Sequence, residues 1–234
     1  MFLPGAIQKK LTKKEIQQIV SFLSYHLNYS PAYLPTVIFA KTAKEFTKYY
    51  RQCKSTDDDF IEELNESTYA FYAHTNNIIV FQGFSYVEGN EDSRFIISLN
   101  TVIHEFLHYF QYATGTFGKY RIFFEGIPEL LSCFFTNDYQ IDYQIESIII
   151  FNLIMHLVNN DEIACINWMK KYLCYSNKDV FIRSELKTCP ELRKINLKLL
   201  DEINSISTIP EILSRYSIND IQKKLQNVQQ IVKL

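Results

Sequence analysis

Glycine and proline are scarce in this sequence, with six of each in 234 residues. Because these residues mark turns and linkers, their scarcity excludes a collagen-like or low-complexity chain and favours a compact, helix-rich protein with short turns. The cysteines are odd in number and show no C-x-x-C spacing: Cys53, Cys133, Cys165, Cys174 and Cys189. This pattern argues against a disulfide framework and against a cysteine-based structural zinc site. It fits free thiols in a reducing compartment.

Long apolar runs and a strong charge of one sign are also missing. The most apolar segment, Ile148–Leu157, is interrupted by Asn152 and His156, and it falls short of the roughly 18 residues of a membrane span. The first apolar stretch is too short for a signal peptide and is followed by Lys9 and Lys10. A formal net charge of −2 gives no electrostatic basis for binding nucleic acid. We therefore expect a cytoplasmic protein with no membrane or nucleic-acid partner.

A histidine motif carries the strongest chemical signal. The segment His104-Glu105-Phe106-Leu107-His108 is an H-E-x-x-H pattern. Apolar residues around it repeat at intervals of three and four, which predicts a helix. His104 and His108 then lie on one face and can aim two imidazoles at one Zn²⁺, while Glu105 can reach a metal-activated water molecule without ligating. The alternative is a helix with two incidental histidines, one or both of which are satisfied by hydrogen bonds in the core.

A catalytic zinc ion needs a third protein ligand and one open position. The metzincin continuation fails because Gln111 and Thr114 stand where glycine and a further ligand are required, and the aspzincin continuation fails after Gly115. The later stretch F-E-G-I-P-E-L offers Glu125 and Glu129, four residues apart and on one helical face. The first can bind the metal while the second accepts a hydrogen bond from a ligating imidazole.

Together the two motifs resemble those of the gluzincins, the thermolysin-like metallopeptidases. The chain is most similar to their compact members, in which an H-E-x-x-H helix is followed by an E-G-x-x-E helix. The similarity extends over roughly residues 35–175, and only the motifs match in letters. It implies an α+β, zincin-like fold with a small mixed β-sheet, the H-E-x-x-H helix and a mainly helical C-terminal half. We expect an N-terminal subdomain, residues 1–135, and a helical C-terminal subdomain, residues 136–234.

The resemblance also implies the roles of the site residues. One Zn²⁺ per chain is bound by His104, His108 and Glu125, with Glu105 as general base and Glu129 as the orienting residue. The expected activity is that of a zinc metallopeptidase, a metallohydrolase acting as an endopeptidase on a peptide or protein substrate.

Two further features of that family can be assigned to candidate segments. An oxyanion is usually stabilised by a tyrosine or histidine on a later helix, and Tyr143 is the first choice, with Tyr139 and His156 as alternatives. A peptide substrate adds to an exposed sheet edge before the metal helix. The strand Ile78–Phe84 is the candidate edge.

The second motif departs from the family pattern at Pro128. Because proline is tolerated in the first turn of a helix, we expect this helix to begin near Glu125 or Gly126. The acidic stretch from Asp57 to Glu63 is expected to be a solvated loop and helix start, or else a site for a basic partner or substrate.

Periodicity and capping signals predict the remaining elements. They are a helix over residues 12–28, a strand at Thr36–Ala40, a helix from Thr42 to about Cys53, a hairpin of Tyr69–Ala73 with Ile78–Phe84, one long helix from Asp92 or Ser93 to Thr114, helices over 145–158, 161–175 and 190–205, and helix starts at Pro210 and Ser217. Two other classes of function stay open: a catalytically inactive metal-binding or regulatory protein with a zincin fold, and a structural helical protein without metal.

Overall fold

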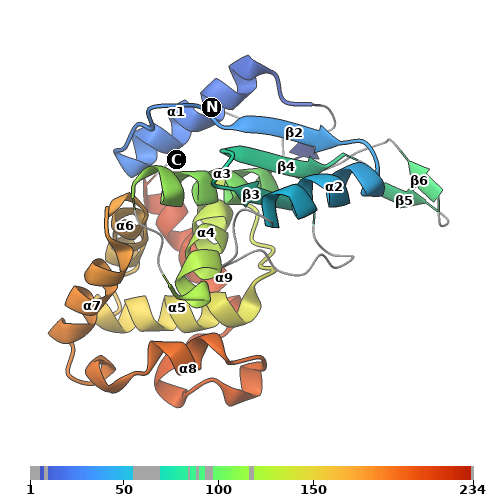
Figure 1. Ribbon diagram of the computed structural model, residues 1–234. Coiled ribbons are helices and arrows are strands. Elements are labelled where there is room, and N and C mark those ends of the chain that lie inside the picture. Colours follow the sequence, from blue (N-terminus) through green and yellow to red (C-terminus); the bar gives the residue numbers. More distant parts are fainter. Residues whose placement is uncertain are drawn as a thin grey trace. The chain divides into compact units, whose positions relative to one another are not determined.

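The computed structural model describes residues 6–7, 10–54, 69–83, 85–87, 90–92, 97–115 and 119–232. It is a mixed α+β protein, 64% helical with a small three-stranded mixed sheet, which confirms the predicted class at that level (Figure 1). The chain forms two compact units, Met1–Ala113 and Thr114–Leu234. The boundary between them lies before the second motif, whereas the sequence-based division falls after residue 135. The acidic stretch from Asp57 to Glu63 lies outside the described residues.

The described residues of the first unit form a three-stranded sheet, two short ladders and three helices. Its elements are β1 (Ala6–Ile7), α1 (Lys13–Leu27), β2 (Thr36–Ala40), α2 (Ala43–Lys54), β3 (Ala70–Ala73), β4 (Ile78–Gln82), β5 (Ser85–Val87), β6 (Asn90–Asp92), β7 (Ile97–Ser98) and α3 (Leu99–Ala113). In the main sheet β2 pairs with β4 in parallel, and β3 pairs with β4 as the predicted antiparallel hairpin. Two short ladders join β1 to β7 and β5 to β6.

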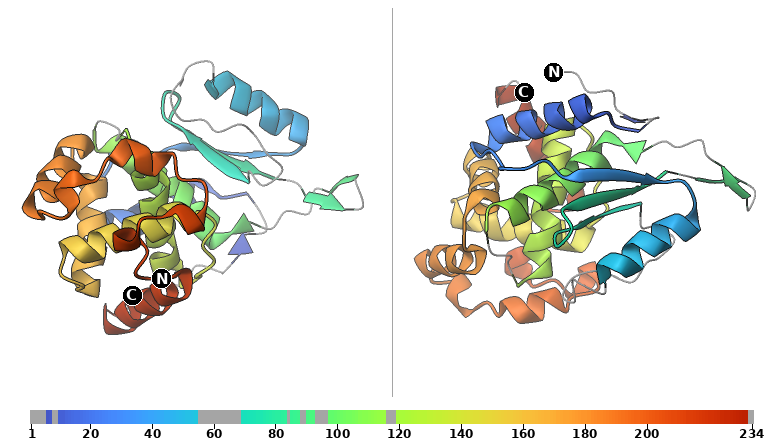
Figure 2. Two further views of the ribbon diagram at one scale, coloured as in Figure 1. Left: turned by 90° about the horizontal axis from the view of Figure 1, so that it is seen from below. Right: turned by 45° about the horizontal axis from the view of Figure 1, so that its top comes forward.

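Helices cover both faces of the three-stranded sheet. Phe71 of β3 contacts Phe46 and Tyr50 of α2, with ring centroids 5.3 and 5.6 Å apart. The next residue, Tyr72, contacts Tyr109 of α3 at 6.1 Å. Because successive strand residues point to opposite faces, α2 and α3 lie on opposite sides of the sheet (Figure 2).

The prediction that Ile78–Phe84 forms a substrate-binding sheet edge is wrong. The strand β4 is central, with β2 on one side and β3 on the other. Its consecutive residues Ile79, Val80 and Phe81 are all fully buried, as in a strand covered on both faces. Among the described residues, the edges of this sheet are β2 and β3.

The predicted long helix from Asp92 or Ser93 to Thr114 is also wrong in its first part. Ile97 and Ser98 form β7, which pairs with Ile7 and Ala6 of β1. The helix α3 starts at Leu99, and the Ser98 Oγ accepts a hydrogen bond from the Thr101 N–H at 3.0 Å. A serine cap therefore ends the strand and begins the helix. The partner strand of β7, β1, lies about 90 residues earlier in the chain, so the periodicity of the local sequence cannot predict this pairing.

The second unit is helical. Its elements are α4 (Arg121–Thr136), α5 (Gln144–Leu157), α6 (Glu162–Cys174), α7 (Lys178–Thr188), η1 (Leu192–Lys194), α8 (Leu197–Asp201), η2 (Ile206–Thr208), η3 (Glu211–Leu213) and α9 (Ile218–Val232). The expected helices over 145–158, over 161–175 and after Ser217 are confirmed. The single helix expected over 190–205 is wrong, because Asn196 is extended and its side chain caps the start of α8. The sequence did not predict α7.

The helix α4 is the centre of this unit. It packs against α5, α6, α8 and α9, and every residue from Ile122 to Phe135 is buried. Among the described residues, no single helix has the length and apolar composition to cross a membrane, although α5 and α6, bent by 111° at their junction, meet that criterion as a pair. Of the cysteines, Cys133, Cys165, Cys174 and Cys189 are free, as expected.

The buried Lys178, at the start of α7, is hydrogen-bonded to the first residue of the second unit. The Lys178 side chain is 1% exposed, and its Nζ donates to Thr114 Oγ1 at 2.9 Å and to the Tyr175 carbonyl at 3.3 Å. Burial lowers its pKa from the usual 10.5 to about 8, partly opposed by the nearby Cys174 thiol. The folded state therefore holds this proton less tightly than the unfolded chain does.

This pKa predicts a pH-dependent stability. Between about pH 8 and 10.5 the unfolded lysine keeps its proton while the folded one has lost it, so the free energy of unfolding should rise with pH. Lys178→Met should remove this rise. Denaturant unfolding of both proteins between pH 7.5 and 9.5 measures the effect, and an identical pH dependence in both would contradict it.

Candidate metal centre

The helix α3 carries a buried stripe of polar side chains along one face. Asn100, His104, His108 and Gln111 follow one another at helical spacing and are at most 7% exposed. Burying polar groups costs free energy unless they are hydrogen-bonded or bind something. The apolar residues of α3 secure the helix in the core, while the stripe supplies chemistry that packing alone does not require.

The two histidines of the motif converge as their spacing predicts. The Nε2 atoms of His104 and His108 lie 3.0 Å apart, with ring centroids 4.7 Å apart. A tetrahedral zinc ion, with Zn–N bonds of about 2.0–2.1 Å, separates two ligand nitrogens by about 3.4 Å. A small movement of either ring would therefore admit the ion, so this pair fits Zn²⁺. Glu105, between them in sequence, is 7% exposed.

Gln111 is a site residue that the sequence reasoning missed. Its Oε1 lies 2.9 Å from His108 Nδ1, and Gln111 is fully buried. Because an amide oxygen only accepts, Nδ1 carries the proton and Nε2 keeps its lone pair for a ligand. This is the orienting contact that metal-binding histidines usually have. The signal was present in the sequence, since Gln111 lies three residues after His108 on the same helical face.

A pair of substitutions tests this role of Gln111. Gln111→Met keeps the volume but removes the acceptor, and it should weaken zinc binding about 10–100-fold. Gln111→Glu keeps an acceptor oxygen in the same place and should bind zinc at least as tightly as wild type. Competition with a chromophoric chelator measures both affinities, and equal affinities for the methionine variant and wild type would refute the role.

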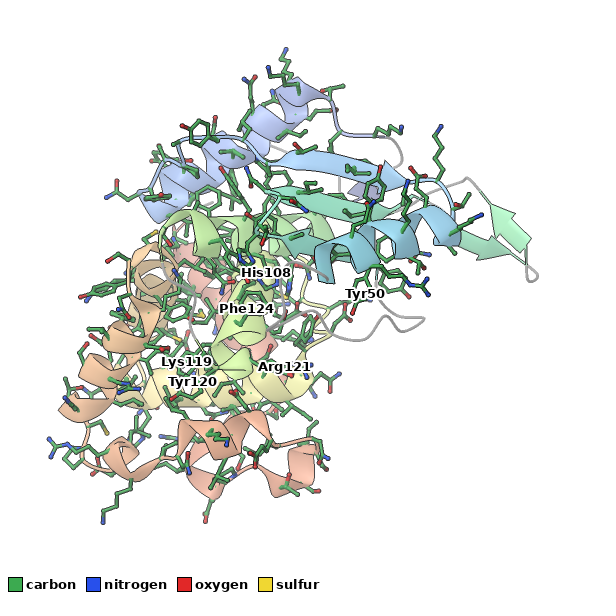
Figure 3. All side chains as sticks on the ribbon, viewed as in Figure 1. Tyr50, His108, Lys119, Tyr120, Arg121 and Phe124 are labelled. Carbon is green, nitrogen blue, oxygen red and sulfur yellow. The ribbon has the colours of Figure 1, made fainter. Side chains whose placement is uncertain are left out.

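The glutamates of the second motif lie on α4, which begins earlier than predicted. The helix starts at Arg121, which is labelled in Figure 3, rather than near Glu125. Pro128 therefore lies in its interior and removes the N–H that would bond the Phe124 carbonyl. No local side chain caps the helix. Instead, the Ile122 N–H donates to Asp201 Oδ1 of α8 at 3.1 Å. Burial raises the pKa of the Asp201 carboxyl, an effect that the hydrogen bonds from the α4 backbone oppose.

The polar residues of α4 form a second buried stripe. Glu125, Glu129 and Ser132 are spaced by four and three residues, and their side chains are 7%, 4% and 0% exposed. Glu129 Oε1 accepts a hydrogen bond from the Asp142 N–H at 2.5 Å. This contact fixes the connection between α4 and α5, one residue before Tyr143.

Gly126 allows α4 and α5 to come close beside Glu125. A Cβ at this position would lie 2.9 Å from the Glu146 carbonyl oxygen of α5. A change of side-chain rotamer could not relieve this contact, because the neighbouring atom belongs to the α5 backbone. The N-terminal end of α5 is therefore held against the turn of α4 that carries Glu125.

Substitution of Gly126 by alanine sets two effects against each other. Helix propensity alone favours alanine by about 1 kcal/mol. The clash with the Glu146 backbone should outweigh it, since overpacking typically costs about 1–3 kcal/mol. We expect Gly126→Ala to lower the melting temperature, by about 2–4 °C for each kcal/mol lost. Calorimetry beside Ser132→Ala, a control on the same helix, measures it, and an increase would contradict the close packing.

The three candidates for oxyanion stabilisation occupy different places in the second unit. Tyr143 is the residue before α5, at the end of the helix that packs against Gly126. The Tyr139 hydroxyl donates to Gln229 of α9 at 2.6 Å, and burial raises its pKa to about 12. His156 lies in the last turn of α5, about 20 Å along the helix from Tyr143.

Each unit thus carries part of a candidate metal centre: a histidine pair with its orienting glutamine in the first, and two buried glutamates in the second. A scan against protein-family models finds no match for this chain, and searches of curated proteins and of solved structures find no similar protein. The likeness to gluzincins therefore rests on the two motifs.

Proposed function

We propose that this chain is a zinc-dependent peptidase with a zincin-like fold. The observation that carries the proposal is the buried polar stripe of α3, in which the Nε2 atoms of His104 and His108 lie 3.0 Å apart and His108 is oriented by Gln111. A structural helix has no need for two facing imidazoles with an orienting amide. A catalytic zinc site needs this arrangement for two of its ligands.

Glu125 is the proposed third ligand. His104, His108 and Glu125 each offer one ligand atom and all three are buried. Two neutral imidazoles and one carboxylate form the ligand set of thermolysin-type zinc sites, which leaves one position open for water and substrate. In this proposal the Glu125 carboxylate supplies a negatively charged ligand, whereas the imidazoles of His104 and His108 bind the metal as neutral ligands.

When bound, Zn²⁺ polarises a water molecule and lowers its pKa toward 7. Glu105 then acts as general base: its carboxylate takes a proton from that water and later gives it to the leaving amine. The burial of Glu105 keeps bulk water away from this transfer. Gln111 holds the proton of His108 on Nδ1, and Glu129 stabilises the helix connection that precedes Tyr143.

Tyr143 remains the first candidate for stabilising the oxyanion. Tyr143 precedes α5 at the end of that helix that packs against Gly126. Gly126 directly follows Glu125 in the sequence. Tyr139 already donates its hydroxyl proton to Gln229, and His156 is at the other end of the helix. A donor in this role is often worth a few kcal/mol of transition-state stabilisation.

The edge strand β3 replaces β4 as the proposed docking site for an extended peptide. It is an edge of the sheet among the described residues, and Tyr72 packs against Tyr109 and Tyr112 of the helix that bears the histidines. Unpaired N–H and C=O groups on such an edge can receive a substrate strand. We therefore expect sequence-tolerant recognition through the peptide backbone.

Hydrolysis of casein or of a quenched-fluorescence peptide library by purified protein tests the proposal. Activity should disappear with a zinc chelator and return when Zn²⁺ is added. Zinc bound without any hydrolysis across the library would favour the alternative of a catalytically inactive metal-binding protein. Absence of zinc and of hydrolysis would favour a structural protein.

A further inference from the structure

A second group of metal-binding side chains lies at the C-terminal end of α5. His156, Cys189 and Glu191 each offer one ligand atom, and these atoms lie within 4.8 Å of one another. Cys189 Sγ donates to Glu191 Oε2 at 3.1 Å. We propose that these three residues form a second zinc site, distinct from the histidine motif and confined to the second unit.

The backbone holds the Cys-Pro-Glu segment in place from both sides. Cys189 is the extended C-cap residue of α7, and its carbonyl accepts hydrogen bonds from the N–H groups of Leu192 and Arg193. The Arg193 guanidinium donates through Nη2 to the Lys187 carbonyl at 2.8 Å, while the Leu192 side chain is fully buried. The thiol and the carboxylate therefore project from an anchored turn, two residues apart.

The electrostatics of this position favour a cation. His156 lies in the last turn of α5 and Cys189 directly follows α7, so two helix C-termini contribute to the site. Each terminus carries roughly half a negative charge. When a metal binds, the Cys189 thiol would lose its proton, and the thiolate and the Glu191 carboxylate would together supply two negative charges that a divalent ion neutralises.

The types of ligand select the metal. Sulfur, imidazole nitrogen and carboxylate oxygen are the three donor types that bind Zn²⁺ in proteins, whereas Mg²⁺ and Ca²⁺ require oxygen ligands. In a tetrahedral zinc site the donor atoms lie about 3.3–3.7 Å apart. Because the Glu191 side chain is exposed, a change of its rotamer can adjust the distances from its carboxylate to the other two donors. The fourth position would be taken by water.

Such a site would link the end of α5 to the segment that follows α7. The ligands come from two stretches more than 30 residues apart, so binding in the folded state stabilises their contact. The role is therefore structural or regulatory for the second unit, independent of peptide hydrolysis.

Titration of the purified full-length chain with Co²⁺ tests the site. A Cys–Co²⁺ bond gives a thiolate charge-transfer absorption in the near ultraviolet, which the sulfur-free set of His104, His108 and Glu125 cannot give. Wild type and the control Cys174→Ser should develop this band, whereas Cys189→Ser should not. His156→Gln should weaken the Co²⁺ affinity by more than the roughly 10–100-fold cost of losing an outer-shell partner.

Thermal unfolding provides a second measurement on the same proteins. Zn²⁺ should raise the melting temperature of Cys189→Ser less than that of wild type and of Cys174→Ser. The proposal is overturned if wild type shows no thiolate band, or if the band and the full zinc-dependent stabilisation persist in Cys189→Ser. Neither outcome would affect the assignment of the histidine motif, which lies in the other unit.

Discussion

Glu105→Gln is expected to leave the protein folded and loaded with zinc while abolishing its peptidase activity. Glutamine has the size of glutamate but lacks a basic oxygen. Loss of a general base alone predicts at least a roughly 10²–10⁴-fold drop in turnover. A Glu→Gln change at a residue without a catalytic role should leave turnover unaltered.

Zinc content, melting temperature and peptide hydrolysis should be measured on one preparation of this variant. Glu202→Gln, at an exposed glutamate of the second unit, is the matched control and should keep full activity. If Glu105→Gln hydrolyses peptides at the wild-type rate, Glu105 is not the base and the proposed chemistry is incorrect.

Glu125→Ala is expected to lose the zinc bound at the histidine motif, together with all activity. Removing one of three protein ligands should cost more affinity than the roughly 10–100-fold typical of an outer-shell contact. Because the proposed site at Cys189 would bind zinc as well, the comparison belongs in a Cys189→Ser background. There the parent should retain one zinc per chain and the double variant close to none.

Glu202→Ala in the same background controls for the loss of a carboxylate. Retention of one tightly bound zinc in the Glu125→Ala variant would mean that the third ligand is another residue. A parent that binds no zinc under conditions that load other zinc enzymes would rule out the metal centre altogether.

The histidine part of the candidate site could be predicted because its determinants are local. The helix period around residues 99–110, the four-residue spacing of His104 and His108, and the three-residue step to Gln111 are all properties of one helix. The capping signal at Thr42 likewise marked the start of α2, as the hydrogen bond from the Glu45 N–H to Thr42 Oγ1 confirms. Local signals of this kind can be recognised in the sequence without knowledge of the tertiary fold.

Features that depend on distant partners were mispredicted. Ile78–Phe84 looked like an edge strand because its second neighbour, β2, joins it in parallel through a long connection. The segment before Leu99 was assigned to the long helix, but its residue Ile97 pairs with Ile7. The start of α4 is capped by Asp201, 79 residues after Ile122, so Pro128 gave a misleading boundary. In each case a tertiary contact outweighed the local pattern.

The most direct test of the metal centre is anomalous diffraction at the zinc absorption edge, from crystals of the Cys189→Ser variant grown with Zn²⁺. We expect one strong peak within bonding distance of His104 Nε2, His108 Nε2 and a carboxylate oxygen of Glu125. The absence of a peak beside the two histidines, or a peak there with Glu125 out of bonding distance, would contradict it.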